Sequence, residues 1–359
     1  MAPTVVVIGA GVIGAAVTYH LARRGARVHC VDRADRPASG TTEVGFATAT
    51  AYRRFPRAYF ELNQAGIDEH AALAGDSAPW WHRTGTVAWT DDESFAGYLT
   101  QLEEWGCPVE RHVPNGGSVV FPSSGPVAFL PSEGWIDAVA FTRHLLDQAV
   151  SHGATLELGA EVTSVSRGAG LADGRRIEAD VVVNATGSAA DEIGALAGAR
   201  PFLGAPRRSL IAHLLVDGDP LDFILRAPEV SIRPDGPGRV VLRSDRVDRG
   251  LPPRSGTPDP EFVKDLLDRA AKVVPLLGTA TVRTAAVVDA RCARDELPSV
   301  GPLSALPGYY EAVASAGVTL APLFGKALAA RIVDGKPDAL VDVFTPDRFG
   351  AGVVSEKQG

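Results

Sequence analysis

The start of the chain combines an apolar run, a glycine-rich break and a helical pattern. Val5–Ile8 is a run of β-branched residues, which predicts a short buried strand. From Val12 to Arg24 the chain has no proline and carries apolar residues at helical intervals, which predicts a helix. Arg27–Val31 predicts a second strand, and Asp32 follows at its carboxyl end. The order of these elements predicts a β-α-β unit.

Three glycines, Gly9, Gly11 and Gly14, stand between the first strand and the helix at the spacing G-x-G-x-x-G. Gly9 allows a tight turn, Gly11 lets a pyrophosphate approach the backbone, and Gly14 lets helix and strand pack closely. The amino terminus of the helix offers free N–H groups and a partial positive charge to phosphates, and Asp32 can accept hydrogen bonds from a ribose. The spacing alone is a weak signal, because a glycine-rich turn can form without a ligand. The complete unit predicts a dinucleotide site.

Two later segments have the pattern of returns to this nucleotide-binding unit. Residues 154–167 and 175–187 predict strands around a turn at Gly168 to Gly174. The second segment ends in the small residues 184–187, which permit close approach of a ligand to the backbone. An ordinary buried strand and turn explains this segment equally well.

Residues 309–335 predict a strand through Ala314, a turn at Gly317 and a helix from Val318 to Val333 that closes on Gly335. A helix amino terminus led by glycine is an anion site, and facing a flavin it would stabilise the anionic reduced ring. The plainer interpretation is a docking helix with a tight entry turn.

The composition narrows the class of protein. A chain of 359 residues is long enough for two domains, and its net charge of −8 gives no reason to expect a nucleic-acid partner. The three cysteines form no C-x-x-C motif, which suits a reducing cytoplasm. The first strand leaves no room for a signal peptide, and no apolar run is long enough to span a bilayer. We therefore expect a cytoplasmic protein with no membrane partner and no metal site. The sequence does not indicate whether the protein is a monomer or an oligomer.

The chain carries one complete dinucleotide fingerprint. The glycines at 168–170 and 194–198 lack this spacing between a strand and a helix, and no C-x-x-x-x-C pair is present. We therefore expect one bound dinucleotide and no site for a nicotinamide reductant.

Taken together, these segments resemble the D-amino-acid-oxidase superfamily of FAD enzymes, in its glycine oxidase and sarcosine oxidase branch. The resemblance rests on residues 5–33, on "ASGTTEVGF", and on the segments 133–154, 181–198 and 295–329. It implies an α/β fold of two domains (α+β), with a Rossmann-type FAD-binding domain and an interleaved mixed β-sheet substrate domain. The implied FAD domain comprises 1–45, 136–200 and 288–345, the substrate-binding domain 46–135 and 201–287, and the carboxyl-terminal tail 346–359.

The resemblance implies FAD bound by residues spread along the chain. It places Val12 and Ile13 at the pyrophosphate, Asp32 with Arg33 at the adenosine ribose, and Val162 at the adenine. The implied cofactor-binding residues are Gly9, Gly11, Val12, Ile13, Gly14, Asp32, Arg33, Ser39, Gly40, Thr41, Thr42, Val44, Gly45, Phe46, Val162, Ala185, Gly187, Ala316, Gly317, Val318 and Thr319.

The chain departs from the family pattern at two positions. Ser315 stands where many relatives carry a histidine just before the late glycine. Cys292 lies about three residues too close to the "DELP" sequence to match the cysteine that attaches the flavin in sarcosine oxidases. We therefore expect non-covalent FAD and a buried structural role for Cys292.

Arg291 is the candidate for binding the substrate. It aligns with the arginine that holds the substrate carboxylate in glycine oxidase and its D-amino-acid relatives. A guanidinium grips a carboxylate bidentately and is always charged. The alternative is a structural ion pair of Arg291 with Asp289 or Asp295. Arg233 and Arg243, which flank a predicted strand pair of the substrate domain, are weaker candidates.

FAD with a carboxylate anchor implies oxidation of an amine next to a carboxylate. The implied substrate is glycine or an N-substituted glycine or amino acid. Its C–N bond becomes an imine that hydrolyses to glyoxylate or a 2-oxo acid plus an amine, while O2 is reduced to H2O2. Oxidation of a 2-hydroxy acid would need a positioned base, usually histidine. Two alternatives stay open: a dehydrogenase that passes electrons to another acceptor, and a flavin-binding subunit without chemistry.

Four tryptophans, Trp80, Trp81, Trp89 and Trp105, gather in the segment assigned to the substrate domain. Tryptophans in such a cluster belong more often to the core than to a pocket. An apolar substituent on the substrate amine becomes reasonable if some of them line the cleft.

Overall fold

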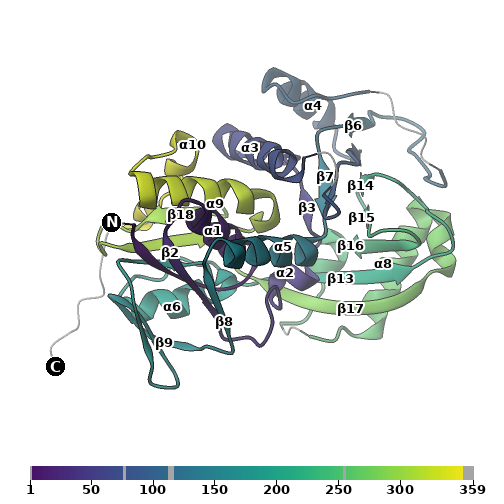
Figure 1. Ribbon diagram of the computed structural model, residues 1–359. Helices are drawn as coiled ribbons and strands as arrows, with labels where there is room; N and C mark the ends of the chain where they lie inside the picture. The colour runs from purple at the N-terminus through teal and green to yellow at the C-terminus, as the bar shows by residue number, and fades with distance from the viewer. Residues whose placement is uncertain (1, 76–77, 112–116, 254–255, 351–359) are drawn as a thin grey trace.

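The computed structural model describes residues 2–75, 78–111, 117–253 and 256–350. Two large sheets dominate the molecule, and Figure 1 shows them in its left and right halves. The left sheet has six strands in the order β18-β19-β12-β1-β2-β8, and only β18 runs antiparallel to its neighbour. Its strands are β1 (Thr4–Ile8), β2 (Arg27–Asp32), β8 (Thr155–Leu158), β12 (Val181–Asn184), β18 (Ser299–Pro302) and β19 (Tyr309–Val313).

Strand β1 is buried on both faces, as its unbroken apolar run predicts. Val5 and Val7 pack with helix α1 (Val12–Arg23), while Val6 and Ile8 belong to a second cluster with strands β9 and β10. Helices α5 (Ala138–Ser151) and α9 (Gly317–Asp334) lie beside α1 over the first of these faces (Figure 1). The sheet is therefore covered by helices on one side and by a small sheet on the other.

That small sheet consists of β9 (Val162–Ser166), β10 (Gly168–Leu171) and β11 (Arg176–Glu178). The predicted turn at Gly168 to Gly174 is wrong in its first half, because β10 occupies it. Gly168, at φ +116°, lets the chain reverse sharply after β9, and the buried side chains of Ala169 and Leu171 then hold β10 in place. Short glycine-rich strands of this kind carry a weak sequence signal.

The right sheet has seven strands in the order β17-β13-β16-β15-β14-β5-β6. Helix α8 (Pro260–Val273) packs on β13 and β16. The strands are β5 (Thr86–Ala88), β6 (Ala128–Leu130), β13 (Arg207–Leu215), β14 (Ile224–Arg226), β15 (Ser231–Pro234), β16 (Arg239–Arg243) and β17 (Thr281–Ala290). The chain passes repeatedly between the two large sheets, and the predicted α/β fold with an interleaved mixed sheet is confirmed.

Shorter elements complete the described chain. A fourth sheet joins β3 (Thr48–Ala49), β7 (Gly134–Ile136) and β4 (Trp81–His82). The remaining helices are α2 (Thr41–Val44), α3 (Arg57–Ala74), α4 (Phe95–Glu104), α6 (Ala190–Leu196), α7 (Asp245–Asp248), α10 (Ala339–Asp342) and three short 3₁₀ turns (Gly187–Ala189, Pro275–Thr279, Pro346–Phe349). Across the described residues, no helix combines the length and the apolar character needed to cross a membrane.

The segment assigned to a carboxyl-terminal tail begins as part of the folded structure. Arg348, in the last 3₁₀ turn, pairs with Asp295 at 2.8 Å and donates to the carbonyl oxygen of Phe344. Residues 346–350 therefore pack against the end of the six-stranded sheet, and residues 351–359 lie outside the described residues.

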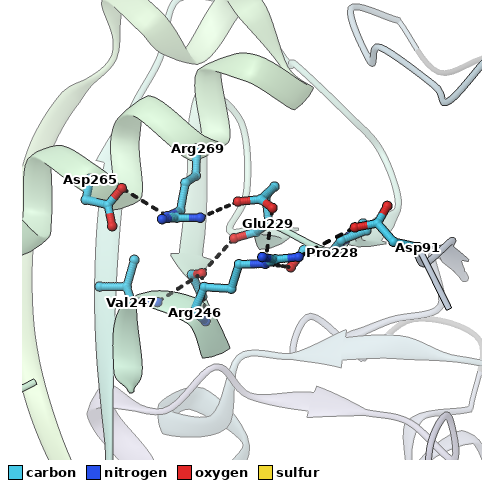
Figure 2. Close-up of polar contacts among 8 residues, drawn as sticks. Asp91, Pro228, Glu229, Arg246, Val247, Asp265 and Arg269 are labelled. Atoms are coloured by element: carbon cyan, nitrogen blue, oxygen red, sulfur yellow. Dashed lines mark hydrogen bonds and ion pairs between the residues drawn. The ribbon is translucent and has the colours of Figure 1, made fainter. Parts of the chain in front are cut away.

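A network of ion pairs joins α7 and α8 to the turn between β14 and β15 (Figure 2). The carboxylate of Glu229, in that turn, pairs with Arg269 from α8 and, at 3.1 Å, with Arg246 from α7. Arg246 also reaches Asp91 at 3.5 Å, and the hydroxyl of Ser244 donates to the Glu229 carbonyl oxygen. Because β14 ends just before this turn and α7 follows β16, the network fixes the ends of both strands.

We predict that Glu229→Gln lowers the stability of the folded protein without changing its fold. The variant loses two partly exposed ion pairs. We therefore expect the free energy of unfolding to fall by about 1 kcal/mol, the upper end of the range for a surface ion pair. The measurement is thermal unfolding at low salt and at ~1 M salt, where screening should shrink the difference. Lys264→Gln, which breaks an exposed pair with Asp268 on α8 alone, is the matched control. Equal melting temperatures for the two variants would contradict the role of the network.

Candidate functional site

A single cavity of about 950 Å³ extends from the six-stranded sheet to the seven-stranded sheet. This volume lies near the upper end of the ~300–1,000 Å³ typical of small-molecule and cofactor sites. One part of its wall comes from the turn after β1, the end of β2, the segment 39–48, the start of β9 and the start of α9. The other part comes from β13, β14, β16 and β17. The cavity is therefore shared by the two halves of the molecule.

The glycine turn has the close contacts that its spacing predicts. A Cβ atom on Gly9, which has φ +109°, would lie 2.6 Å from the carbonyl oxygen of Ala185, and one on Gly14 would lie 1.8 Å from that of Gly9. A Cβ atom on Gly11 would meet only the Thr42 hydroxyl, at 3.4 Å, and otherwise points into the cavity. Gly9 and Gly14 thus serve the packing of the backbone, while Gly11 leaves room for a ligand.

Polar groups around this turn are arranged for a dinucleotide. Gly11 precedes α1, and the N–H of Val12 donates to the Thr42 hydroxyl at 3.2 Å. The carboxylate of Asp32 accepts from the N–H groups of Ala10, at 2.6 Å, and Ala34, at 2.8 Å, so it is held at the cavity wall. A fixed carboxylate beside a helix amino terminus suits a ribose and a pyrophosphate.

The start of α9 closes the same cavity from another side. The hydroxyl of Thr319 donates to the carbonyl oxygen of Thr48 at 3.0 Å, which joins α9 to the segment 46–48. A Cβ atom on Gly317 would lie 3.2 Å from the Ile13 side chain, so α9 and α1 begin next to each other. Two helix amino termini therefore face one cavity, as the sequence predicts for an anion-binding arrangement.

The structure brings almost all of the sequence-predicted cofactor residues to this cavity. Gly14 and Val44 are the exceptions, and Gly14 lies directly behind the turn. The predicted residues that line the cavity are Gly9, Gly11, Val12, Ile13, Asp32, Arg33, Ser39, Gly40, Thr41, Thr42, Gly45, Phe46, Val162, Ala185, Gly187, Ala316, Gly317, Val318 and Thr319. The residues present therefore fit one extended dinucleotide, and their individual roles toward it remain predictions.

The side chain of Arg291 does not line the cavity. Its guanidinium pairs with Asp191 at 3.2 Å and donates to the carbonyl oxygen of Gly204 at 3.1 Å, while its backbone N–H donates to the Ser188 hydroxyl. Arg291 thus forms an ion pair, as in the alternative weighed from the sequence, but its partner is Asp191 and not Asp289 or Asp295. A guanidinium held by a carboxylate has less to offer a substrate, so this geometry lends no support to the predicted anchor.

Besides Arg33, three further arginines line the cavity: Arg54, Arg226 and Arg243. In each of them the Nε atom is buried and has no hydrogen-bond partner among the described residues. Arg226 and Arg243 share Ser231 as their neighbour across β15, so they lie on the same face of the sheet, with Cα atoms about 9.5 Å apart. Sequence reasoning weighed Arg243 as a weaker candidate and missed the other two, because no motif surrounds them. Arg233, the other weak candidate, donates to the Phe46 carbonyl oxygen instead of lining the cavity.

Arg226 is the guanidinium best placed beside the predicted flavin site. It donates to the Thr48 hydroxyl at 3.2 Å and lies 4.8 Å from the ring centre of Phe46. Burial and the positive charge of Arg243 lower the pKa of Arg226 to about 10, so it stays protonated at neutral pH. Among the described residues no carboxylate lies within 4 Å of it, whereas Arg243 pairs with Asp245 and, at 3.6 Å, with Asp248.

Several side chains are notable for lying away from the cavity. None of the three cysteines lines it, and Cys292 is buried as expected. The four tryptophans of the predicted cluster also lie outside its wall, with Trp80 and Trp89 in the core. Within the described ranges, no histidine lines the cavity and no group of three potential metal ligands occurs.

We predict that Gly11→Val abolishes FAD retention and leaves the polypeptide folded. The backbone of Gly11, with φ −76°, suits valine, and its side chain would meet only Thr42 before entering the space meant for the pyrophosphate. The measurements are the ratio of flavin to protein absorbance and far-ultraviolet circular dichroism. Gly97→Ala, in the open on α4, should keep both signals, and Gly14→Ala should lose both. Stoichiometric flavin in Gly11→Val would show that the nucleotide lies elsewhere.

Comparison with known proteins agrees with this geometry. The family model described as "FAD dependent oxidoreductase" (DAO) matches residues 4–331. The chain is 25% identical over 378 residues to the "Uncharacterized oxidoreductase YurR" of Bacillus subtilis, covering 96% of this chain and 98% of that protein. It is also 25% identical to the mitochondrial dimethylglycine dehydrogenase of Mus musculus. That alignment covers 96% of this chain but only 44% of the relative.

Two solved structures share the whole fold. The glycine oxidase from Geobacillus kaustophilus superposes with a TM-score of 0.83 at 22% identity, over 96% of this chain and 98% of that one. The L-proline dehydrogenase from P. horikoshii superposes with a TM-score of 0.84 at 20% identity, over 97% and 98%. With the family model spanning nearly the whole described chain and the cavity fitting a dinucleotide, the protein belongs to the DAO family of FAD-dependent oxidoreductases and is an enzyme that binds FAD.

Proposed function

We propose that this enzyme oxidises the C–N bond of glycine or of an N-substituted glycine or amino acid. The product is an imine, whose hydrolysis gives glyoxylate or a 2-oxo acid and an amine, and O2 is the electron acceptor. The observation that carries the proposal is Arg226, a buried guanidinium without a carboxylate partner among the described residues, in the same cavity as the FAD-binding residues. A buried unpaired charge of this kind is costly unless a ligand neutralises it.

The chain would hold FAD along the wall already described, without a covalent bond. Asp32 would hold the ribose, the start of α1 the pyrophosphate, and the residues from Ala316 to Thr319 the flavin edge. Bound FAD supplies the acceptor for the two electrons and the hydrogen that leave the substrate Cα. Non-covalent attachment is supported by the cavity wall itself, to which none of the three cysteines contributes.

Arg226 would orient the substrate by its carboxylate. The Thr48 hydroxyl fixes one side of the guanidinium, and Thr48 is in turn joined to Thr319 at the start of α9. A carboxylate bound there would place the substrate beside the residues at the start of α9 that would hold the flavin. Orientation of this kind is a large part of what an enzyme contributes to a reaction of bound groups.

The acid–base groups of the cavity favour an amine over an alcohol as donor. Among the described residues that line it, the carboxylates are Asp32, Glu161 and Glu192, on segments at the nucleotide end, and no imidazole is present. An amine that has bound in its neutral form can be oxidised without a side-chain base. A 2-hydroxy acid needs a base to take the proton from its hydroxyl group. The neighbours named glycine oxidase and iminodiacetate oxidase, at 22% identity each, are consistent with this choice.

The proposed function predicts that glycine, sarcosine or a longer N-substituted glycine bleaches the flavin absorbance of the purified enzyme under anaerobic conditions. Admission of air should restore the absorbance and produce H2O2, measured with an oxygen electrode and a peroxidase assay. Bleaching that only an added quinone or protein acceptor reverses would identify a dehydrogenase instead. The mitochondrial relative named dimethylglycine dehydrogenase makes that the second candidate. An enzyme that no amine bleaches would contradict the proposal.

We predict that Arg226→Gln raises KM for the amine substrate by about tenfold or more. A hydrogen bond to a charged group contributes ~1.5–3 kcal/mol, and its loss should weaken binding accordingly. The sequence-based hypothesis, which assigns the carboxylate to Arg291, expects this effect from Arg291→Gln. The observed pair with Asp191 predicts that Arg291→Gln mainly lowers the melting temperature. Steady-state kinetics and thermal unfolding of both variants separate the two hypotheses, since a KM effect confined to Arg291→Gln would reject Arg226 as the anchor.

A further inference from the structure

Apart from Arg33, which pairs with Glu192, the cavity wall carries three arginines, and one substrate carboxylate can pair closely with only one of them. Arg243 is already paired with Asp245 and Asp248, and Arg226 would take the α-carboxylate under the proposed function. That leaves Arg54, which lines the cavity and comes from the segment between β3 and α3. The positive charge of Arg54 therefore needs a negative partner of its own.

The surroundings of Arg54 contain no such partner in the described part of the chain. Among these residues no carboxylate lies within 4 Å of its guanidinium, its Nε is buried without a hydrogen bond, and its guanidinium carbon lies 5.7 Å from the ring centre of Tyr59. Arg57, three residues further on, shows the contrast, because it is exposed and paired with Glu61 at 2.7 Å. Arg54 is only partly buried, but the water lost by its Nε is not replaced by any hydrogen bond among the described residues, so an anion bound in the cavity would supply the missing partner.

The segment that carries Arg54 is held rigidly before any ligand arrives. The buried carboxylate of Glu133 accepts from the N–H groups of Ala51 and Tyr52, both at 2.8 Å, and the N–H of Arg53 donates to the Tyr98 hydroxyl at 2.6 Å. Glu133 uses one oxygen for this backbone anchoring, and among the described residues no arginine lies within 4 Å of its carboxylate, although the charges of Glu133 and Arg226 attract each other over a longer distance. Fixing the backbone next to a binding group reduces the entropy lost on binding.

We propose that the substrate carries a second anionic group, a carboxylate, which Arg54 binds while Arg226 holds the α-carboxylate. The two guanidinium groups come from different elements, the segment after β3 and strand β14, so they can hold the two ends of one molecule. The chemical class is an amino dicarboxylate, in which the second carboxylate is on the side chain or on the N-substituent. This inference rests on the proposed function and names its substrate class.

The kinetic test compares two substrates that differ only in this charge: N-(2-carboxyethyl)glycine and its side-chain amide, N-(2-carbamoylethyl)glycine. We expect the holoenzyme to favour the dicarboxylate in kcat/KM by about tenfold or more, the value of one charge-assisted contact. Arg54→Gln should bring this ratio close to one, Arg54→Lys should restore part of it, and Arg57→Gln should leave it as in the wild type. A wild-type ratio near one, or a ratio unchanged in Arg54→Gln, would overturn the proposal.

A binding test separates this inference from the proposed reaction. Succinate and its half-amide, succinamate, cannot be oxidised at a C–N bond next to a carboxylate, and their binding to the holoenzyme is measured by perturbation of the flavin spectrum. Tighter binding of succinate that is lost in Arg54→Gln supports the second anionic site even if no amine is oxidised. Oxidation of glycine with equal binding of both ligands would uphold the proposed function and reject this inference.

Discussion

The close backbone contact between Gly9 and Gly14 determines where the cofactor half of this enzyme begins. With no side chain on Gly14, helix α1 starts directly behind the turn, where a Cβ atom would lie 1.8 Å from the Gly9 carbonyl oxygen. A similar contact joins α1 to α9, because a Cβ atom on Gly325 would lie 2.5 Å from the Ala16 carbonyl oxygen. These contacts bring the amino termini of both helices to one cavity, so the partial positive charges of both helices act on the same ligand.

The substrate half of the cavity depends on a different feature, namely positively charged side chains that are held in place without a paired carboxylate. Arg54 and Arg226 are held at the wall by the backbone of a rigid segment and by strand β14, and the described residues offer neither of them a carboxylate within 4 Å. Such groups lower the stability of the empty protein, and they become favourable only when an anion is bound. The ionic network around Glu229 fixes the turn after Arg226 and so helps to hold this arrangement.

Arg291 and Arg226 illustrate how sequence and structure differ as guides to a binding residue. Arg291 stands in a segment that resembles a family motif, yet its side chain turns to Asp191, which lies 100 positions earlier in the chain. Arg226 has no motif around it and reaches the cavity because β14 pairs with β15 and β5 in the seven-stranded sheet. Local sequence specifies the backbone course of such a segment, while the direction of a long side chain depends on which partners the rest of the chain supplies.

The sequence by itself determined the β-α-β unit, the glycine turn and the helix that ends at Gly335, because these follow from local periodicity and from backbone positions that only glycine can occupy. The family was indicated by the resemblance of several segments to the D-amino-acid-oxidase superfamily. The sequence also identified most of the residues around the cofactor cavity, since they lie in the turns that connect those elements. The tertiary structure alone decided that Gly168–Leu171 is a strand and that Arg54, Arg226 and Arg243 meet at one wall. Residues from three separate segments come together only through the pairing of distant strands, and no pattern within a single segment encodes that pairing.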